Sequence, residues 1–244
     1  MNSKRIAMWS GPRNISTAMM YSFNSRPDTY CSDEPLYAHY LAKTGIAHPG
    51  ASEVISNGQT DWNTIVNSLS QDSPDNSRIW YQKHMCHHIL NDMNLDWISS
   101  LTNCFLIRNP SEVLISLSKK TDAIDAWATG LPQQALIVEY VRDLGQIPII
   151  VDSRDILLDP RGMLSQLCLQ LDIEFDNSML LWNIGPKECD GIWSKHWYDA
   201  VWASKEFAKY QPSVEVLKPE YEPILKEVRP IYEQLYAQRL RNQV

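Results

Sequence analysis

Short apolar segments alternate along the chain with longer segments of helical periodicity. Several of the short segments lack the alternation of polar and apolar residues that half-exposed strands show, which is typical of strands buried on both faces. Such strands occur in parallel sheets whose faces are covered by helices, so the pattern predicts an α/β fold. The predicted strands are Arg5–Trp9, Thr29–Ser32, Ile79–Lys83, Cys104–Ile107 and Ile147–Asp152.

Six longer segments have the pattern of helices. In the last of them, an apolar stripe that includes Leu225, Val228 and Leu235 is flanked by charged residues, which favours a helix that packs on the body of the protein. Residues 45–78 are rich in Gly, Ser, Asn and Asp, so we expect a connecting excursion there, with a modest helical patch near Trp62–Leu69. The predicted helices are Ser16–Asn24, Asn94–Leu101, Ser111–Lys119, Gln133–Leu144, Arg161–Leu171 and Glu220–Arg239.

Composition narrows the class of protein. The 244 residues, 44% of them hydrophobic, fit one domain over residues 1–244 with its C-terminal helix within 219–244. The five cysteines include no C-x-x-C pair and the N-terminus lacks the apolar run of a secretion signal, so we expect a reducing, cytoplasmic location. No run of 18 apolar residues predicts a membrane span. The net charge of -7 argues against nucleic-acid and anionic-membrane partners.

An anion site is predicted where the first strand meets the first helix. The segment 6–23 runs from an apolar strand through a Gly-Pro turn into a helix, and the N–H groups and dipole of a helix N-terminus attract phosphate or sulfate. Arg13 adds a positive charge, and Ser16 and Thr17 add hydroxyl donors. A Walker A loop would have Gly, Lys and Ser/Thr where Ile15, Ser16 and Thr17 stand, which argues against routine ATP hydrolysis.

A second strand-to-helix turn carries similar groups. In segment 104–119 an apolar strand ends in Arg108 and Asn109, and Pro110 then opens a helix at a position where its missing N–H costs nothing. Arg108 and Ser116 are candidate donors to a second anion. Two such turns, each with an arginine at its mouth, favour a ligand with two anionic groups.

These turns resemble those of the sulfotransferases that use 3′-phosphoadenosine 5′-phosphosulfate (PAPS). GPRNIST from Gly11 is similar to the family's 5′-phosphosulfate loop, and RNPSEVLIS from Arg108 is similar to its 3′-phosphate segment. A later stretch, PKECDGIW, keeps the K-x-x-x-G-x-W spacing of a third family motif. The resemblance implies a P-loop-type three-layer sandwich with a central parallel sheet. It also implies nucleotide contacts from Gly11, Pro12, Arg13, Asn14, Ile15, Ser16, Thr17, Arg108, Ser116, Lys187, Gly191 and Trp193.

The match departs from the family at three positions. Ile15 replaces the usual loop glycine, Arg13 stands where many members have lysine, and Pro186 stands where the late motif has arginine. The combination of SGPRNIST with DEPLY is similar to a subgroup known only as sulfotransferase-like, so the resemblance does not specify the acceptor. It implies transfer of a sulfuryl group from PAPS, without a metal, to a hydroxyl or less readily an amine of a small molecule, with release of 3′,5′-ADP.

The chemistry implied requires stabilisation of the departing phosphate and removal of a proton from the acceptor. Arg13 and its loop are suited to the first task. Lys83 lies where the family often carries a lysine and is a candidate contact to the bridging oxygen, with a solvated strand end as its ordinary alternative. Glu34 and His84 compete for the role of base. We favour Glu34 because a similar E-P-L segment carries the proposed base in several family members, although a turn carboxylate is its structural alternative.

Other functions remain alternatives. The cluster HMCHH resembles a zinc ligand set, but no second Cys/His group has ligand spacing, so we expect no metal site. A small-molecule kinase with a divergent P-loop would need a Walker lysine, which this loop lacks. A non-catalytic nucleotide-binding module of the same fold is compatible with Ile15 and the imperfect late motif, whereas Glu34 and Lys83 favour retained chemistry.

Overall fold

A sheet of five parallel strands forms the centre of the protein. The computed structural model describes residues 3–119, 121 and 124–242. The strands lie in the order β2-β3-β1-β4-β5, and all neighbouring pairs are parallel. All five predicted strands are present, which confirms the predicted α/β class. Their bounds are β1 (Lys4–Ser10), β2 (Thr29–Asp33), β3 (Ile79–Met85), β4 (Thr102–Ile107) and β5 (Ile149–Asp152).

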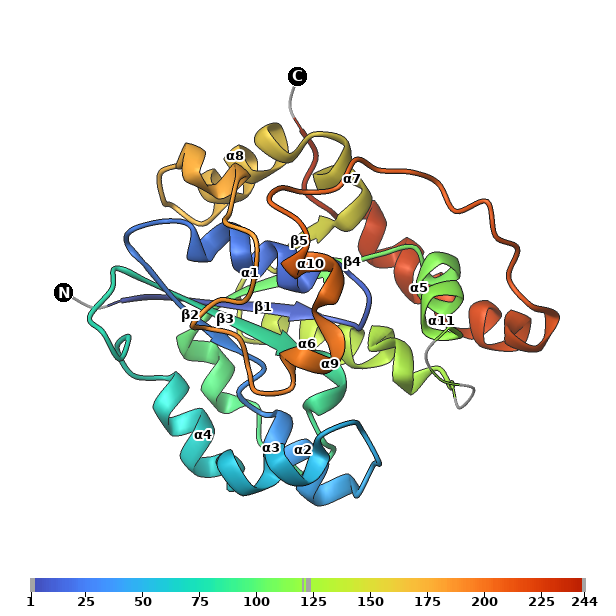
Figure 1. Ribbon diagram of the computed structural model, residues 1–244, viewed down its shortest axis with the longest axis horizontal. Coiled ribbons are helices and arrows are strands. Elements are labelled where there is room, and N and C mark those ends of the chain that lie inside the picture. The colour runs from blue at the N-terminus through green and yellow to red at the C-terminus, as the bar shows by residue number, and fades with distance from the viewer. Residues whose placement is uncertain (1–2, 120, 122–123, 243–244) are drawn as a thin grey trace.

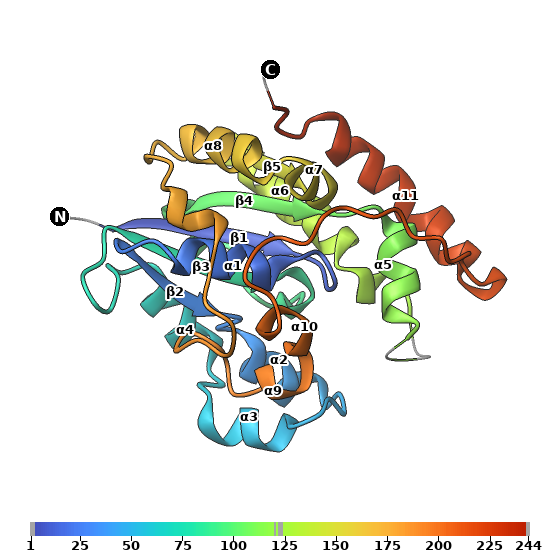
Figure 2. The same ribbon diagram turned by 45° about the horizontal axis from the view of Figure 1, so that its top comes forward.

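Helices cover both faces of this sheet and make three layers (Figures 1 and 2). Alternate residues of β1 face opposite layers, since Ile6 and Met8 pack beside α1 whereas Ala7 and Trp9 pack beside α6. Every residue of β3 is buried, as expected for a strand covered on both sides. One layer contains α1 (Ser16–Asn24) and α8 (Pro160–Gln170), and the other contains α4 (Trp62–Leu69), α6 (Leu131–Asp143) and α11 (Glu222–Ala237).

The chain diverges to opposite layers after the neighbouring strands β1 and β4. The first continues into α1, and the second continues through α5 (Pro110–Leu117) into α6. Divergence of this kind places ligand sites at the carboxyl ends of the strands. The fully buried amide of Gln134 donates from α6 to the carbonyls of Trp9, at 3.2 Å, and Leu106, at 2.9 Å. Gln134 thus provides hydrogen bonds to backbone carbonyls of β1 and β4 near the ends of these strands, where the chain turns to opposite layers.

Residues 45–78 form more helix than the sequence predicts. The predicted patch is α4, whose N-cap Asp61 accepts a hydrogen bond from the backbone N–H of Thr64 at 3.0 Å. The unpredicted α3 (Ala51–Asn57) buries only Val54, so its sequence carries little helical periodicity. With the preceding α2 (Tyr37–Thr44), it makes a small core of its own around Leu41 and Val54.

The remaining elements are short. The predicted helix at Asn94–Leu101 is a 3₁₀ helix, η2 (Asp96–Ser100), and the predicted C-terminal helix consists of η5 (Pro219–Tyr221) followed by α11. The C-terminal helical segment predicted over 219–244 includes residues 243–244, which lie outside the described residues. The other short helices are η1 (Cys86–His88), η3 (Trp127–Thr129), α7 (Ser153–Leu158), η4 (Asn177–Leu180), α9 (Ser194–Trp197) and α10 (Asp199–Trp202).

We predict that Gly130→Ala destabilises the protein more than Gly145→Ala. Both glycines have φ of +75°, so alanine at either position costs about 1–2 kcal/mol of backbone strain. At Gly130 the added Cβ would also lie 2.7 Å from the Cα of Gly11, whereas at Gly145 it would meet no atom within 4 Å. Overpacking should add about 1–3 kcal/mol to the loss at Gly130. Urea unfolding of both variants measures this difference, and equal losses would contradict the close approach of the two loops.

Candidate active site

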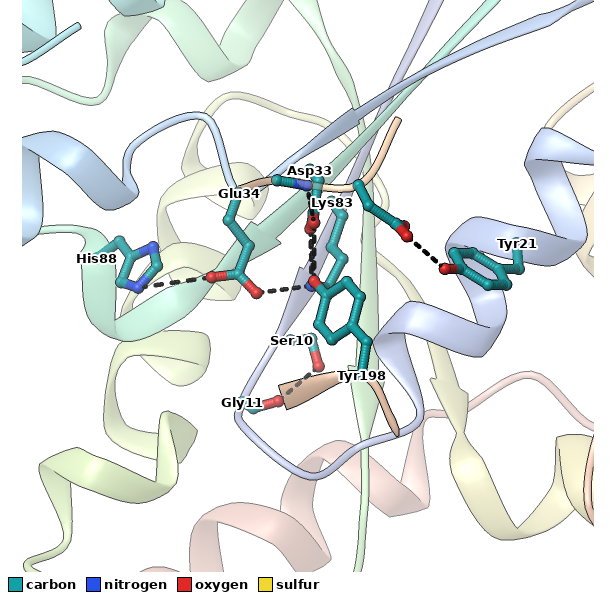
Figure 3. A network of polar contacts seen from close by, with 10 residues as sticks. Ser10, Gly11, Tyr21, Asp33, Glu34, Lys83, His88 and Tyr198 are labelled. Carbon is teal, nitrogen blue, oxygen red and sulfur yellow. Dashed lines mark hydrogen bonds and ion pairs between the residues drawn. The ribbon is translucent and has the colours of Figure 1, made fainter. Parts of the chain in front are cut away.

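A buried lysine links the ends of β2 and β3. Asp33 is the register partner of Lys83 on the neighbouring strand, so the two side chains share one face of the sheet. The Nζ atom of Lys83 lies 2.8 Å from Oδ1 of Asp33 and 2.6 Å from Oε1 of Glu34. It also donates to the hydroxyl of Tyr198 at 2.6 Å, and that hydroxyl donates to the carboxylate of Asp33 (Figure 3). We call Asp33, Glu34, Lys83 and Tyr198 the lysine network.

The charges of this network depend on its burial. Burial alone would lower the pKa of Lys83, but the two adjacent carboxylates raise it well above its usual range, so the lysine is a cation. Burial raises the pKa of Glu34, an effect that Lys83 opposes and Asp33 reinforces. Burial, and then the charge of Asp33, raise the pKa of Tyr198 well above its usual range. Glu34 is therefore a stronger base than an exposed glutamate.

The ammonium group of Lys83 has three N–H donors and three partners in this network. Its side chain is only 1% exposed. A contact with a bridging oxygen, which the sequence suggests, would require one of these hydrogen bonds to be given up. The arrangement is better suited to holding Glu34 in place than to touching a nucleotide.

Glu34 has an unusual backbone conformation. Its φ is +43°, a region that residues with a side chain rarely adopt. Hydrogen bonds hold the backbone there, from the N–H of Glu34 to the carbonyl of Lys83 and from the N–H of Tyr37 to the carbonyl of Glu34, each at 2.9 Å. The Glu34 side chain is 12% exposed, so it is accessible. Strained positions of this kind are concentrated at functional sites.

The two candidate bases lie in different environments. His84 follows Lys83 in β3 and so faces the opposite layer, where its ring stacks on Trp9 with centroids 4.5 Å apart. Burial lowers the pKa of His84 to about 3, and its Nε2 lies 3.2 Å from Oε1 of Gln82. The structure therefore does not bring His84 to the lysine network.

His88 lies close to Glu34, with its Nε2 at 3.9 Å from Oε2 of that carboxylate. Burial, with the neighbouring His87 and Lys83 cation adding to the effect, lowers the pKa of His88 well below its usual range. His88 is therefore neutral, and its contact with Glu34 is not an ion pair. Its ring instead stacks on Tyr37, with centroids 4.9 Å apart.

The loop predicted to bind the first anion lies at the end of β1. Gly11, Pro12, Arg13, Asn14 and Ile15 make the loop, and Ser16 and Thr17 begin α1. Arg13 and Ile15 have φ of 63° and 58°, and the side chain of Ile15 at the N-cap has no polar atom to accept from the N–H groups of α1. Those N–H groups are the donors of an anion site.

The second predicted turn converges on this loop. The Nε of Arg13 donates to the hydroxyl of Ser116 at 2.8 Å, and Nη1 of Arg108 donates to the carbonyl of Arg13 at 2.7 Å. Arg108 also pairs with Glu112 at 2.9 Å. Partial desolvation by the surrounding protein, and then the positive charge of Arg108, lower the pKa of Arg13. The two arginines gather positive charge at one loop although Arg108 is paired with Glu112, which supports an anion site here.

The late motif lies at the other end of the sheet edge, beside β2. The N–H of Gly191 donates to Oδ2 of Asp33 at 3.0 Å, and Trp193 packs edge-on against Tyr37 with centroids 5.0 Å apart. Lys187 donates to carbonyls within its own loop. Within the described residues, no hydrogen bond or ion pair links these three residues to Arg13, Arg108 or Ser116. A Cβ on Gly191 would lie 2.1 Å from the Trp193 ring, so the Gly-x-Trp spacing has a packing reason.

Some residues of the site are not predictable from local pattern. Tyr198 is 115 positions from Lys83 in a tryptophan-rich segment without a motif of its own. Gln134 lies within a helix whose sequence indicates only packing. Asp33 stands in the sequence only as the residue before Glu34, whereas the structure makes it a direct partner of Lys83 and Gly191.

The described part of the chain lacks two features that would indicate other classes of protein. No group of three or more His, Cys, Asp or Glu residues is placed so as to hold a metal ion. His84 and His88 stack on different aromatic residues, Trp9 and Tyr37. None of the helices in the described ranges has the length and apolar character needed to cross a bilayer.

Comparison with known proteins gives the family. A model of the sulfotransferase domain matches residues 4–239. The chain belongs to the sulfotransferase domain family, which confirms the resemblance. Family membership supports a transferase with sulfotransferase activity. A sulfotransferase from Alicyclobacillus acidocaldarius has the same fold, with a TM-score of 0.56, 11% identity and coverage of 99% of this chain and 98% of that one.

Two curated plant proteins are also similar. Branched-chain-amino-acid aminotransferase-like proteins 1 and 2 of Arabidopsis thaliana are each 32% identical over 227 residues. The match covers 93% of this chain but 40% of each relative, so this chain spans less than half of their length.

We predict that Lys83→Met lowers the free energy of unfolding by about 3–5 kcal/mol at neutral pH, because it leaves two buried carboxylates without their cation. The loss should shrink as pH falls, since the carboxylates then take up protons more readily in the folded than in the unfolded state. Lys195→Met is the control, because Lys195 makes an exposed ion pair with Glu53 and should lose less than about 1 kcal/mol. Denaturant unfolding from pH 5 to 8 measures both, and a small, pH-independent loss for Lys83→Met would contradict this view of the network.

Proposed function

We propose that this protein transfers a sulfuryl group from PAPS to a hydroxyl, or less readily an amine, of a small molecule in the cytoplasm. The observation that carries the proposal is the arrangement along one sheet edge. The segment 11–17, together with Arg108 and Ser116 that contact it, is called the two-arginine loop and lies at the end of β1. The lysine network lies at the ends of the next strands, β3 and β2. All five cysteines are free thiols, which supports a reducing compartment.

The loop residues suit the two anionic ends of such a nucleotide. The N–H groups at the start of α1, with Ser16 and Thr17, are the donors that we assign to the 5′-phosphosulfate. Arg108 and Ser116 are the donors that we assign to the 3′-phosphate, and Arg13 lies between the two groups because it contacts Ser116. Gly11 allows this loop to approach η3, since a Cβ there would lie 2.2 Å from the carbonyl oxygen of Thr129.

The proposed reaction moves one sulfuryl group and one proton. PAPS supplies the activated sulfuryl group: the bond from its sulfur to the bridging oxygen breaks as a bond from sulfur to the acceptor oxygen forms. Glu34 takes the proton of the acceptor, and Arg13 with the loop N–H groups stabilises the charge left on the departing phosphate. Lys83 keeps Glu34 in position. A strained, accessible base of this kind is unnecessary for a module that only binds nucleotide, which favours catalysis over that alternative.

We predict that 3′,5′-ADP stabilises the protein without added metal. At a concentration of 100 times Kd the gain is about 2.7 kcal/mol, which raises Tm by roughly 5–10 °C for a chain of this length. The nucleotide 5′-AMP should give a smaller shift because it lacks the 3′-phosphate. Arg108→Ala should remove the difference between the two, whereas equal shifts in the wild-type protein would contradict a 3′-phosphate site. Differential scanning fluorimetry measures all four shifts.

We predict that Glu34→Gln retains nucleotide binding while turnover falls by about 10²- to 10⁴-fold, since the amide keeps the size but loses the basic lone pair. Turnover is measured by mass spectrometry of sulfated products from a metabolite extract incubated with PAPS. His84→Ala should cost less. The wild-type rate should fall as pH drops through the raised pKa of Glu34, above the ordinary glutamate range of about 4.3. Near-normal turnover in Glu34→Gln together with an inactive His84→Ala would transfer the role of base to His84.

A further inference from the structure

A pocket of about 260 Å³ opens beside Glu34 and contains no part of the two-arginine loop. Glu34 and Pro35 line it where β2 ends. Ala38 of α2 and Val54 of α3 line it from one side, and the late segment Asp190–Trp193 lines it from the other. The candidate base is thus shared between the lysine network and this pocket.

An ion pair, an aromatic contact and a hydrogen bond join the two walls of the pocket. Lys195 pairs with Glu53 at 2.6 Å, which joins α9 to α3. The Trp193 ring packs against Tyr37 of α2, and the N–H of Gly191 is bonded to Asp33 at the end of β2. Figure 2 shows α9 beside α2 and α3. The late segment is therefore built into the wall of this pocket, on the side of the sheet edge away from Arg108 and Ser116.

The lining of the pocket includes acidic residues but no basic ones. Glu34 and Asp190 are its two charged residues, and no lysine, arginine or histidine lines it. The Oδ1 of Asp190 is buried and its Oδ2 accepts from the hydroxyl of Tyr21 at 2.7 Å, so Glu34 is the charge that the pocket presents to a ligand. Lys83 neutralises Glu34 from within the protein but is almost fully buried. A negatively charged group entering this pocket would meet like charge and find no cation, whereas a neutral or positively charged group would not be repelled.

The remaining lining indicates the shape of the ligand. Val54, Ile192 and the Trp193 ring give it apolar surface, and Ile192 is 41% exposed. The volume is slightly below the range of about 300–1,000 Å³ that drug-sized ligands occupy. We propose that this pocket binds the acceptor, a small hydroxyl compound with an apolar or aromatic body that carries no negative charge. We also propose that Gly191 and Trp193 form the wall of this acceptor site and do not contact the 3′-phosphate. Only the role of the ligand as acceptor rests on the proposed function.

Three phenols of similar shape test the charge preference. We choose 4-ethylphenol, which is neutral, 4-(2-aminoethyl)phenol, which is a cation, and 4-hydroxyphenylacetate, which is an anion. Isothermal titration calorimetry with and without 3′,5′-ADP should show the first two binding wild-type protein at least tenfold more tightly than the anion. Ile192→Lys adds a cation to the lining and should reduce this preference about fivefold or more. Ile184→Lys is the matched control, because Ile184 is 68% exposed and does not line the pocket, and it should leave the preference unchanged.

The outcomes separate the two proposals. Absence of binding by all three phenols, equal binding of the anion, or the same effect from both lysine variants would overturn the acceptor pocket. A tenfold change of 3′,5′-ADP affinity in either direction in Ile192→Lys, absent in Ile184→Lys, would place the late segment in the nucleotide site and overturn the acceptor pocket as well. If wild-type protein fails to bind 3′,5′-ADP, the proposed function fails, whereas the phenol titrations without nucleotide still decide the pocket.

Discussion

The buried charge of Lys83 is the constraint on which the rest of the site depends. A cation that is almost fully removed from water must be surrounded by compensating groups, and here they come from two other parts of the chain. Asp33 ends β2 and Glu34 follows it, and Tyr198 lies just beyond α9. Because the same carboxylate of Asp33 also accepts from Gly191, one charge orders the strand ends, the proposed base and the late segment together.

This constraint also accounts for the strained backbone of Glu34. A positive φ at a residue with a side chain persists only where the surroundings hold it. At Glu34 the carboxylate is held by Lys83 and the backbone by two hydrogen bonds, so contacts of both the side chain and the backbone stabilise the unfavourable conformation. The result is a carboxylate that is both fixed and accessible at the edge of a pocket.

Much of the fold could be predicted because continuous apolar runs identify buried strands and their order suggests a parallel sheet. The approach of Arg108 and Ser116 to Arg13 agrees with the expected gathering of strand ends at one edge. Short helices such as α3 were missed because one buried residue leaves no periodicity to detect. The pairing of Glu34 with Lys83, and not with His84, depends on which face of β3 each side chain occupies. A strand buried on both faces carries no polar alternation from which to decide this.

Positive and negative side chains lie at different ends of the sheet edge that carries the candidate site. Arginines gather where β1 and β4 end, and carboxylates gather where β2 ends, although the chain as a whole is acidic. A nucleotide with two anionic groups would therefore be attracted to the arginine half of this edge and repelled from the carboxylate half, which would remain open to an uncharged acceptor. This separation of charge would keep the nucleotide out of the acceptor site without any conformational change.

The late segment makes this architecture dependent on distant parts of the chain. The residues of the two-arginine loop all lie between Gly11 and Ser116, whereas Gly191 and Tyr198 return to Asp33 across sequence separations of 158 and 165 residues. Because synthesis proceeds from the N-terminus, the contacts of Gly191 and Tyr198 can form only after every residue of the two-arginine loop is present. The half of the edge that we assign to the nucleotide can therefore assemble before the half that we assign to the acceptor has its wall. In the mature protein, local opening that frees the late segment would expose the lysine network to water while leaving the arginine loop closed.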